Sequence, residues 1–434
     1  MNDIYNELEK IKMFDTHTHM DAGHISARGL HDILLYHMVI SDLYSAGCPN
    51  GARLSEDPSE EEAISRIKQA IPYIKHIQNT SCFWGVRIIL KDLYGWEEPI
   101  TAENFQKLHT LIKNKSDSPD WGKSIIRKAG VLRVCTELWR GRGHLHNDVF
   151  QYSLEWAFFA RCQWGQFDTA LLELENAWGQ NEPGAPLPVT IGKRPVLSKT
   201  IRTLDDVREA IKHYCDKIPY EKTINTAQHL STDINYRSVT DDEMAKALKN
   251  RDNAGVAERD IYSCYILEQF LKKIENKNLL FLFSFGAEPL VYETGSKLKA
   301  DSVFQLAAIL ERHPNVKFQA ALASEHQNQS MCTLAREHPN LSLAGYWWHN
   351  FFPSSIRKIM NERFDMLAAN KQIGFFSDAY CADWLYAKAV IVRKQLAEVL
   401  TGKIKQGQYT SGQALDTAKQ ILFDSPVSLA GMKV

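Results

Sequence analysis

The sequence lacks any long apolar run. The longest extends only from Leu279 to Phe285, whereas a helix needs roughly 20 apolar residues to cross a bilayer. The first residues, Met1 to Lys12, mix charged and apolar side chains, which is not the pattern of a secretory signal peptide. We therefore expect a cytoplasmic protein that has no membrane partner.

The sequence is also short of net charge and of paired cysteines. Its formal net charge is -1 over 434 residues, and a nucleic-acid-binding surface usually shows as an excess of basic residues. The eight cysteines are scattered without a Cys-x-x-Cys pair, which argues against a structural zinc site and favours reduced thiols. What remains is a globular chain with 44% hydrophobic residues, from which we expect a small-molecule partner and no nucleic acid.

Two histidines follow the first short apolar run of the chain. Ile11 to Phe14 precede Asp15, and His17 and His19 come directly after it. Alternate side chains of an extended segment lie on one face, so both imidazoles point the same way. Two converging imidazoles suit a divalent metal ion. At the C-terminal rim of a parallel barrel, that position is where active sites lie.

A matching signal lies near the other end of the chain. Ile373 to Ser377 form a short apolar segment that ends at Asp378, and a lone buried carboxylate needs a cation or hydrogen-bond donors nearby. A closed eight-stranded barrel places its first and last strands side by side, so that His17, His19 and Asp378 can share one ion. The alternative is that Asp378 caps the helix expected from Ala382.

Strand and helix patterns alternate most clearly after residue 260, as in parallel βαβ units. A (β/α)₈ barrel takes roughly 250 residues, so we predict an α/β fold in which residues 1–434 form a single metal-dependent TIM-like barrel. Residues 47–128 show helical patterns only and are predicted to be a helical insertion after the first strand–helix unit. The expected strands are Lys12 to Thr16, Val131 to Thr136, Thr223 to Gln228, Leu279 to Phe285, Val316 to Ala321, Leu341 to Ala344 and Gln372 to Ser377.

Several segments, taken in order, also match one known pattern. They are Phe14 to His19, Leu34 to Met38, Val134 to Thr136, Ala227 to His229, Gly345 to Asn350 and Phe376 to Asp378. The pattern resembles the uronate isomerases, a branch of the amidohydrolase superfamily, over almost the whole chain. The resemblance implies a metal ion on His17, His19 and Asp378, with zinc expected and manganese as the alternative. It also implies interconversion of an aldose and a ketose form of a hexuronate, such as glucuronate and fructuronate. His37 falls on the active-site histidine of the family.

The chain departs from the family pattern at positions that carry chemistry. Met38 stands where the family has a tyrosine, and Tyr380 stands where it has an arginine that would grip the sugar carboxylate. Tyrosine cannot reproduce the bidentate charge of arginine. Ser284 occupies the place of a histidine. These departures leave open a different sugar acid as substrate or a loss of activity.

The candidate residues therefore fall into two groups. Asp378 is expected as metal ligand, base or both, and His37 as a proton carrier. The expected substrate-binding residues are Arg140, Arg142, His229, Trp347, Trp348 and Tyr380. Arg140 and Arg142 are the candidates to replace the missing arginine, and the two tryptophans are candidates for stacking on a sugar ring. Solvated loop charges and core packing are the respective structural alternatives.

Two other classes of function use the same ligands. In metal-assisted hydrolysis, Asp378 would act as the base. Hydrolases of this superfamily usually add histidines from the middle strands, where this chain offers only His229, and this favours the isomerase. A non-catalytic sugar-acid binder is the third alternative, although it would have no need to keep a metal site. The assembly is either a monomer or a homo-oligomer.

Overall fold

A computed structural model describes residues 2–55, 58–141, 148–159, 168–185, 187, 195–220, 223–230, 236–285, 287–289, 296–298, 303–347 and 351–432. Its centre is an eight-stranded sheet in the order β1-β2-β3-β4-β5-β8-β9-β10, and each pair of neighbours is parallel. The strands are β1 (Met13–Asp15), β2 (Val131–Glu137), β3 (Phe150–Phe159), β4 (Thr223–Leu230), β5 (Leu280–Phe285), β8 (Lys317–Leu322), β9 (Leu341–Ala344) and β10 (Gln372–Ile373).

The two edge strands of this sheet, β1 and β10, are joined through the segments that follow them. The backbone nitrogen of His19 donates to the carbonyl oxygen of Ala379 at 2.9 Å, and that of Asp378 donates to the carbonyl oxygen of His17 at 3.0 Å. These bonds link the C-terminal ends of the first and last strands, as the closed ring of a barrel requires. The predicted α/β TIM-like barrel is therefore confirmed.

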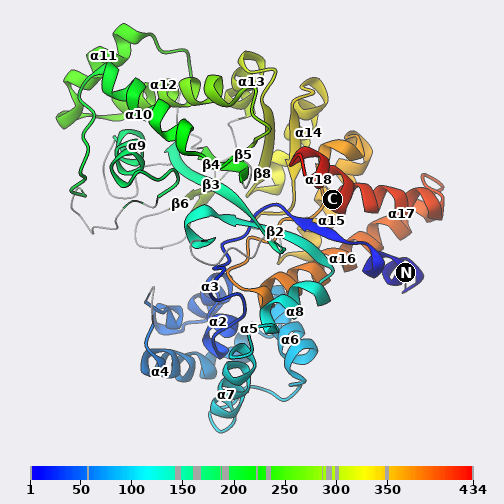
Figure 1. The fold of residues 1–434 in the computed structure, drawn as a ribbon. Helices are drawn as coiled ribbons and strands as arrows, with labels where there is room; N and C mark the ends of the chain where they lie inside the picture. The colour runs from blue at the N-terminus through cyan, green and yellow to red at the C-terminus, as the bar shows by residue number, and fades with distance from the viewer. Residues whose placement is uncertain are drawn as a thin grey trace.

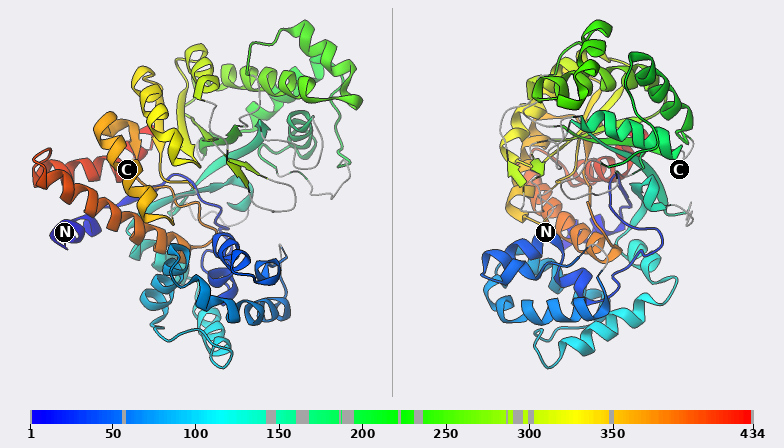
Figure 2. Two further views of the ribbon diagram at one scale, coloured as in Figure 1. Left: turned by 180° about the vertical axis from the view of Figure 1, so that it is seen from behind. Right: turned by 90° about the vertical axis from the view of Figure 1, so that its left-hand side faces the viewer.

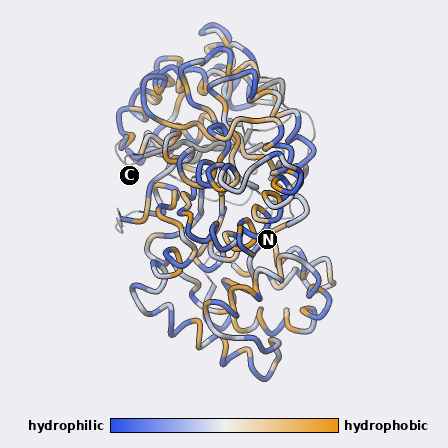
Figure 3. The backbone as a smooth tube through the Cα atoms, turned by 90° about the vertical axis from the view of Figure 1, so that its right-hand side faces the viewer, coloured by the Kyte–Doolittle hydropathy of each residue, from blue (hydrophilic) through white to orange (hydrophobic). Residues whose placement is uncertain are grey.

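Helices cover the outside of the barrel (Figures 1 and 2). They are α1 (Asn2–Lys10), α9 (Thr169–Gln180), α10 (Leu204–Lys217), α11 (Asp241–Lys249), α12 (Val256–Ile274), α13 (Val303–Arg312), α14 (Asn328–Glu337), α15 (Pro353–Met366), α16 (Ala382–Lys405), α17 (Ser411–Lys419) and α18 (Ser425–Leu429). Hydrophobic and hydrophilic stretches follow one another at short intervals along the chain (Figure 3), as expected where helices bury one face. Within the described ranges, no helix combines the length and apolarity that crossing a bilayer requires.

Between β1 and β2 the chain is helical. The elements are α2 (Leu30–Leu34), α3 (His37–Ser45), η1 (Pro49–Ala52), α4 (Glu60–Ala70), η2 (Ile71–Tyr73), α5 (Ile74–Ile77), α6 (Ser81–Tyr94), α7 (Phe105–Ser116) and α8 (Trp121–Lys128). They lie together on one side of the barrel, opposite α10 to α13 (Figures 1 and 2). The start of α4 is set by Ser59, whose side chain accepts a hydrogen bond from the backbone of Glu62, a typical N-cap. That 47–128 forms an insertion within a single domain stays a prediction.

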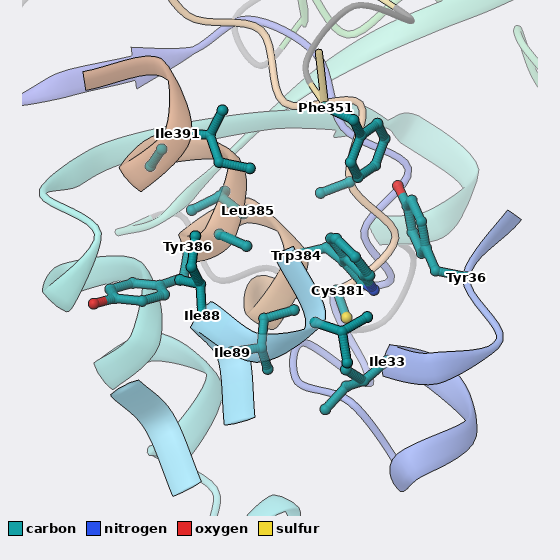
Figure 4. Close-up of a cluster of buried hydrophobic side chains, with 14 of the residues drawn as sticks. Ile33, Tyr36, Ile88, Ile89, Phe351, Cys381, Trp384, Leu385, Tyr386 and Ile391 are labelled. Atoms are coloured by element: carbon teal, nitrogen blue, oxygen red, sulfur yellow. The ribbon is translucent and has the colours of Figure 1, made fainter. Parts of the chain in front are cut away.

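Helix α16 packs the helical region against the barrel. Trp384 stacks on Tyr36 with ring centroids 4.6 Å apart and contacts Phe351 edge-on at 5.3 Å, and Figure 4 shows these rings beside isoleucines of α2 and α6. A methyl group on Gly85 of α6 would lie 2.6 Å from the Trp384 ring, so this helix approach requires glycine. The packing places Tyr36, and with it the start of α3, next to the segment after β10.

The structure differs from the expected strands in three respects. Strand β3 was not among them, although Phe150 to Trp156 alternate apolar and polar residues, the pattern expected of a strand. Strand β10 ends at Ile373 instead of Ser377, because the backbone nitrogen of Gly374 donates to the carbonyl oxygen of Ile421 at 2.8 Å. Ile421 belongs to the π-helical segment η8 (Gln420–Asp424). Its carbonyl oxygen thus accepts the hydrogen bond that a neighbouring strand would otherwise accept. A short antiparallel pair, β6 (Ala287–Pro289) and β7 (Ser296–Leu298), also adds to the expected elements.

Candidate metal centre

Three side chains meet where the first and last strands end. His17 and His19 follow β1, and Asp378 follows β10, so the seam described above brings them together. Nε2 of His17 lies 3.5 Å from Oδ1 of Asp378, and Nε2 of His19 lies 3.2 Å from the same oxygen. One ligand atom from each residue lies within 4.8 Å of the other two. We call these three residues the metal triad.

The metal triad fits a divalent cation by its donors and by its burial. Two imidazole nitrogens and one carboxylate oxygen are ligands that zinc and manganese accept. Asp378 is 6% exposed, and no donor among the described residues is aligned for a hydrogen bond with its Oδ1. Burial would raise the pKa of Asp378, but its contacts with His17 and His19 hold that pKa well below the usual range. A buried, ionised carboxylate that faces two imidazoles is a favourable place for a cation.

The backbone of Asp378 is held in a conformation that is unusual for aspartate. Its φ is 52°, in the left-handed region, which is unfavourable for residues other than glycine by roughly 1 kcal/mol or more. The carbonyl oxygen of Asp378 accepts hydrogen bonds from the Tyr36 hydroxyl at 2.9 Å and from Nζ of Lys388 at 3.1 Å. Lys388 also donates to the carbonyl oxygen of Ser377 at 2.5 Å. These bonds hold the loop in which the carboxylate faces the histidines.

Lys388 is therefore a buried cation directly behind the metal triad. It is 1% exposed, and desolvation lowers its pKa to about 8 in spite of the nearby charge of Asp378. Sequence reasoning missed both Lys388 and Tyr36. The available signal was a lysine between Ala387 and Ala389 in an apolar stretch of the helix, since a lysine at such a position needs hydrogen-bond acceptors.

Glu137 and Arg140 support the other side of the metal triad. Glu137 ends β2, is 2% exposed, and its Oε1 lies 2.5 Å from Nδ1 of His19. Nε of Arg140, in the 3-10 turn η3 (Leu138–Gly141), lies 2.7 Å from Oε2 of Glu137. Burial would raise the pKa of Glu137, but His19 and Arg140 lower it to about 2. Burial lowers the pKa of His19, yet the charge of Glu137 outweighs it and raises that pKa well above the usual value.

Asp15, at the end of β1, is a further buried carboxylate of this rim. Its Oδ1 accepts hydrogen bonds from the backbone nitrogens of His17 at 3.3 Å and Ser377 at 3.0 Å. Burial raises the pKa of Asp15 to about 6, and these two donors limit the rise. Asp15 thus joins the two segments that carry the metal triad.

His37 and Tyr380 border the metal triad on a side that solvent reaches. His37 begins α3, and its ring centroid lies 4.3 Å from that of Tyr36 and 5.7 Å from that of Tyr380. Tyr380 is 47% exposed and lies 4.9 Å from the His19 ring. Although His37 as a residue is exposed, desolvation of its ring and the charge of Lys388 lower its pKa. His37 is consequently neutral near pH 7, with one ring nitrogen that carries no hydrogen.

The remaining predicted substrate-binding residues do not all lie beside the metal triad. The guanidinium of Arg140 lies 5.9 Å from the Tyr380 ring, beside the metal triad. Trp347 is 5% exposed and packs in a core cluster with Leu282 and Phe376, which matches the core-packing alternative. His229 lies on β4 opposite Ser284 of β5, and its side chain lies outside the described part of the structure. Arg142 and Trp348 also lie outside the described residues.

The fold and the metal triad together define a (β/α)₈ barrel with a candidate metal centre at the C-terminal ends of its strands. No protein-family model matches the sequence, and no curated protein matches it significantly. Solved structures do match. The uronate isomerase of Thermotoga maritima is 12% identical with a TM-score of 0.77, and the match covers 98% of this chain and 96% of that one. The glucuronate isomerase of Caulobacter crescentus is 12% identical with a TM-score of 0.78, covering 99% and 93% of the two chains.

Two further matches extend the comparison. The uronate isomerase of Bacillus halodurans is 16% identical with a TM-score of 0.72, covering 100% of this chain and 96% of that one. A protein of Lactobacillus casei that carries the provisional description of a metal-dependent hydrolase is 11% identical with a TM-score of 0.62, covering 99% and 97%. The chain therefore has the fold of the uronate isomerases over nearly its whole length.

Proposed function

We propose that this protein is a metal-dependent aldose–ketose isomerase that acts on a hexuronate or a related sugar acid, of the glucuronate/fructuronate type. The observation that carries the proposal is the convergence of His17, His19 and Asp378 within 4.8 Å at the rim of the barrel. The likeness to uronate isomerases in fold supports it. Zinc is the proposed metal, with manganese as the alternative.

The reaction moves a proton between adjacent carbons, and the residues near the metal triad suit that task. A bound divalent ion would polarise the hydroxyl and carbonyl oxygens of those carbons. His37, whose ring lies beside those of Tyr36 and Tyr380 at the metal triad, is proposed to take the proton from one carbon and return it to the next. Asp378 is proposed to hold the metal and to assist as a base.

The sugar carboxylate needs a cationic partner in place of the arginine that the family has at position 380. Nε of Arg140 lies 2.7 Å from Oε2 of Glu137 in an ion pair, and the guanidinium lies 5.9 Å from the Tyr380 ring. We propose that its remaining donors bind the substrate carboxylate, since a guanidinium fork matches a carboxylate. Tyr380 would then form a wall of the substrate site. Roles for Arg142, His229, Trp347 and Trp348, a cytoplasmic location and a homo-oligomer remain predictions.

The direct test is a coupled assay on the metal-loaded protein with glucuronate and galacturonate, in which ketose formation is followed. Turnover that disappears after chelation and returns with zinc or manganese is the expected result. A metal-loaded protein that forms no ketose from either sugar acid would contradict the proposal. His37→Asn is expected to bind metal and sugar acid while losing most of its turnover.

Metal-assisted hydrolysis is the second candidate function, favoured by the likeness to the Lactobacillus casei protein. The same metal triad would serve it, with Asp378 as the base. Release of an acid or an amine from a panel of lactones, esters and amides, without ketose formation, would support the hydrolase. Saturable binding of the sugar acid without any turnover would indicate a binding protein instead.

A further inference from the structure

The imidazole of His19 lies between two carboxylates. Its Nε2 is 3.2 Å from Oδ1 of Asp378, and its Nδ1 is 2.5 Å from Oε1 of Glu137. The two nitrogens therefore face different partners, one toward the metal triad and one away from it. Glu137 is 2% exposed, so water does not compete strongly for the bond between Glu137 and His19.

The partners of Glu137 determine where the imidazole proton lies. Nε of Arg140 is 2.7 Å from Oε2 of Glu137, and a charge this close keeps the carboxyl group ionised. An ionised carboxylate only accepts hydrogen bonds, so the hydrogen between Glu137 and His19 belongs to Nδ1. In the neutral ring, the lone pair is then on Nε2, which faces Asp378 and the centre of the metal triad.

We propose that Glu137 is a positioning residue that fixes both the tautomer and the orientation of His19, and that Arg140 fixes Glu137 in turn. The inference rests on the proposed metal centre and deepens it. A carboxylate on the far nitrogen of a liganding histidine locks the ring and raises its basicity. Among the described residues, the potential ligand atoms that converge belong to His17, His19 and Asp378, and Glu137 is not part of this group. We therefore infer that Glu137 acts through His19.

Metal affinity in the full chain tests this role independently of turnover. Zinc affinity is measured by competition with a chromogenic chelator for the wild type, Glu137→Gln and Glu137→Leu. Glutamine keeps an acceptor for Nδ1 without the charge, whereas leucine removes the acceptor. We expect about 10-fold weaker binding for the glutamine variant and about 100-fold weaker binding for the leucine variant, the range seen when such outer partners are lost. Equal affinities in all three proteins would overturn the proposal.

Glu175→Gln is the matched control. Glu175 lies on α9, is also 2% exposed, and its Oε2 accepts a hydrogen bond from Arg251 at 2.8 Å. Its substitution likewise removes one buried glutamate charge that an arginine pairs with, but it leaves the metal triad untouched. We expect this variant to lose stability while keeping the zinc affinity of the wild type. A loss of affinity equal to that of Glu137→Gln would show a general effect of destabilisation and would overturn the proposal.

A second measurement separates this inference from the proposed function. Nitrogen-15 NMR of the imidazoles in the metal-free protein, with His19 assigned from a His19→Gln variant, reports which nitrogen carries the hydrogen. The Nδ1–H tautomer or a ring protonated on both nitrogens with a strongly deshielded Nδ1 hydrogen is expected, and a Nε2–H tautomer would overturn the inference. If the wild type binds no zinc, the proposed function fails, but this tautomer measurement still decides the role of Glu137. X-ray absorption at the zinc edge counts the ligands of the bound metal. Loss of one oxygen ligand in Glu137→Gln would show that Glu137 is itself a ligand and would also overturn the inference.

Discussion

The backbone nitrogen of Asp378 donates a hydrogen bond to the carbonyl oxygen of His17 at 3.0 Å, and this bond joins the two ends of the barrel. Oδ1 of the same aspartate lies 3.5 Å from Nε2 of the same histidine. The same pair of residues therefore takes part both in backbone closure of the barrel and in assembly of the metal triad. A change at either residue is expected to affect metal binding before it affects the fold, because the backbone bond does not need the side chains.

His17→Ala and Asp378→Asn are the first substitutions to make. Each removes one of the three proposed ligands, so we expect the metal content of the purified protein to fall from about one equivalent to near zero. Metal content is measured by inductively coupled plasma mass spectrometry, and the fold by circular dichroism. His24→Ala serves as control, because His24 follows the same strand but lies outside the metal triad. Full metal content in either ligand variant would contradict the assignment.

Lys388→Met is predicted to destabilise the protein and to weaken its metal binding. The ammonium group donates to the carbonyl oxygens of Ser377 and Asp378, and losing hydrogen bonds from a charged donor costs roughly 1.5–3 kcal/mol. Urea unfolding gives the stability and chelator competition gives the metal affinity. Lys403→Met is the control on the same helix, since Lys403 is buried and bonds Asp365 away from the metal triad. In Lys403→Met only the stability should fall. Equal metal affinities of Lys388→Met and Lys403→Met would contradict the positioning role of Lys388.

Much of this arrangement follows from local patterns in the sequence. The alternation of His17 and His19 behind a strand, and an acid behind the last strand, predict a shared centre once the chain forms a closed barrel. Local patterns likewise indicate helix α13, Val303–Arg312, because an apolar periodicity there stops before Pro314.

The supporting residues follow only from three-dimensional packing. Nothing local to Glu137 distinguishes a partner of His19 from a surface ion pair, because the 2.5 Å contact depends on the pairing of β1 with β2. Tyr36 precedes the expected histidine and reaches Asp378 because Trp384 packs against its ring. The early end of β10 depends on Ile421, which is distant in sequence. Such contacts between remote segments have no periodic signature.

Arg140→Met is predicted to raise the KM for a uronate by about 10- to 100-fold, the equivalent of one charged hydrogen bond of roughly 1.5–3 kcal/mol. The reason is loss of the guanidinium that we propose to bind the substrate carboxylate. Steady-state kinetics with glucuronate give KM and kcat, and competitive inhibition by a neutral sugar of the same ring reports binding without the carboxylate. Because Arg140 is also proposed to fix Glu137 and through it His19, both sugars are measured with zinc at saturation, and affinity for the neutral sugar should then change little. Arg202→Met, which removes an exposed partner of Asp252, is the control. A uniform loss of affinity for charged and neutral sugars would contradict the prediction.

The pH dependence of stability should carry the signature of Asp15. Burial raises its pKa from 3.8 to about 6, so the folded protein binds this proton more tightly than the unfolded chain does. The contribution of Asp15 to stability is therefore fully present below pH 4 and is lost as the pH rises toward 6. In metal-free protein, the unfolding free energy of the wild type should fall relative to Asp15→Asn across this window. A shift of about two pKa units sets an upper bound of roughly 3 kcal/mol on that change.

Urea unfolding of both proteins between pH 4 and pH 7, with a chelator present, checks this prediction. The difference between the two proteins isolates Asp15, because the other carboxylates of the rim are common to both. Glu137 has a pKa lowered to about 2, so its contribution has the opposite sign and is lost only as the pH falls below its unfolded value. A difference between wild type and Asp15→Asn that stays constant from pH 4 to pH 6 would show that Asp15 ionises normally. The two backbone donors from His17 and Ser377 would then stabilise the charged form enough to offset its burial.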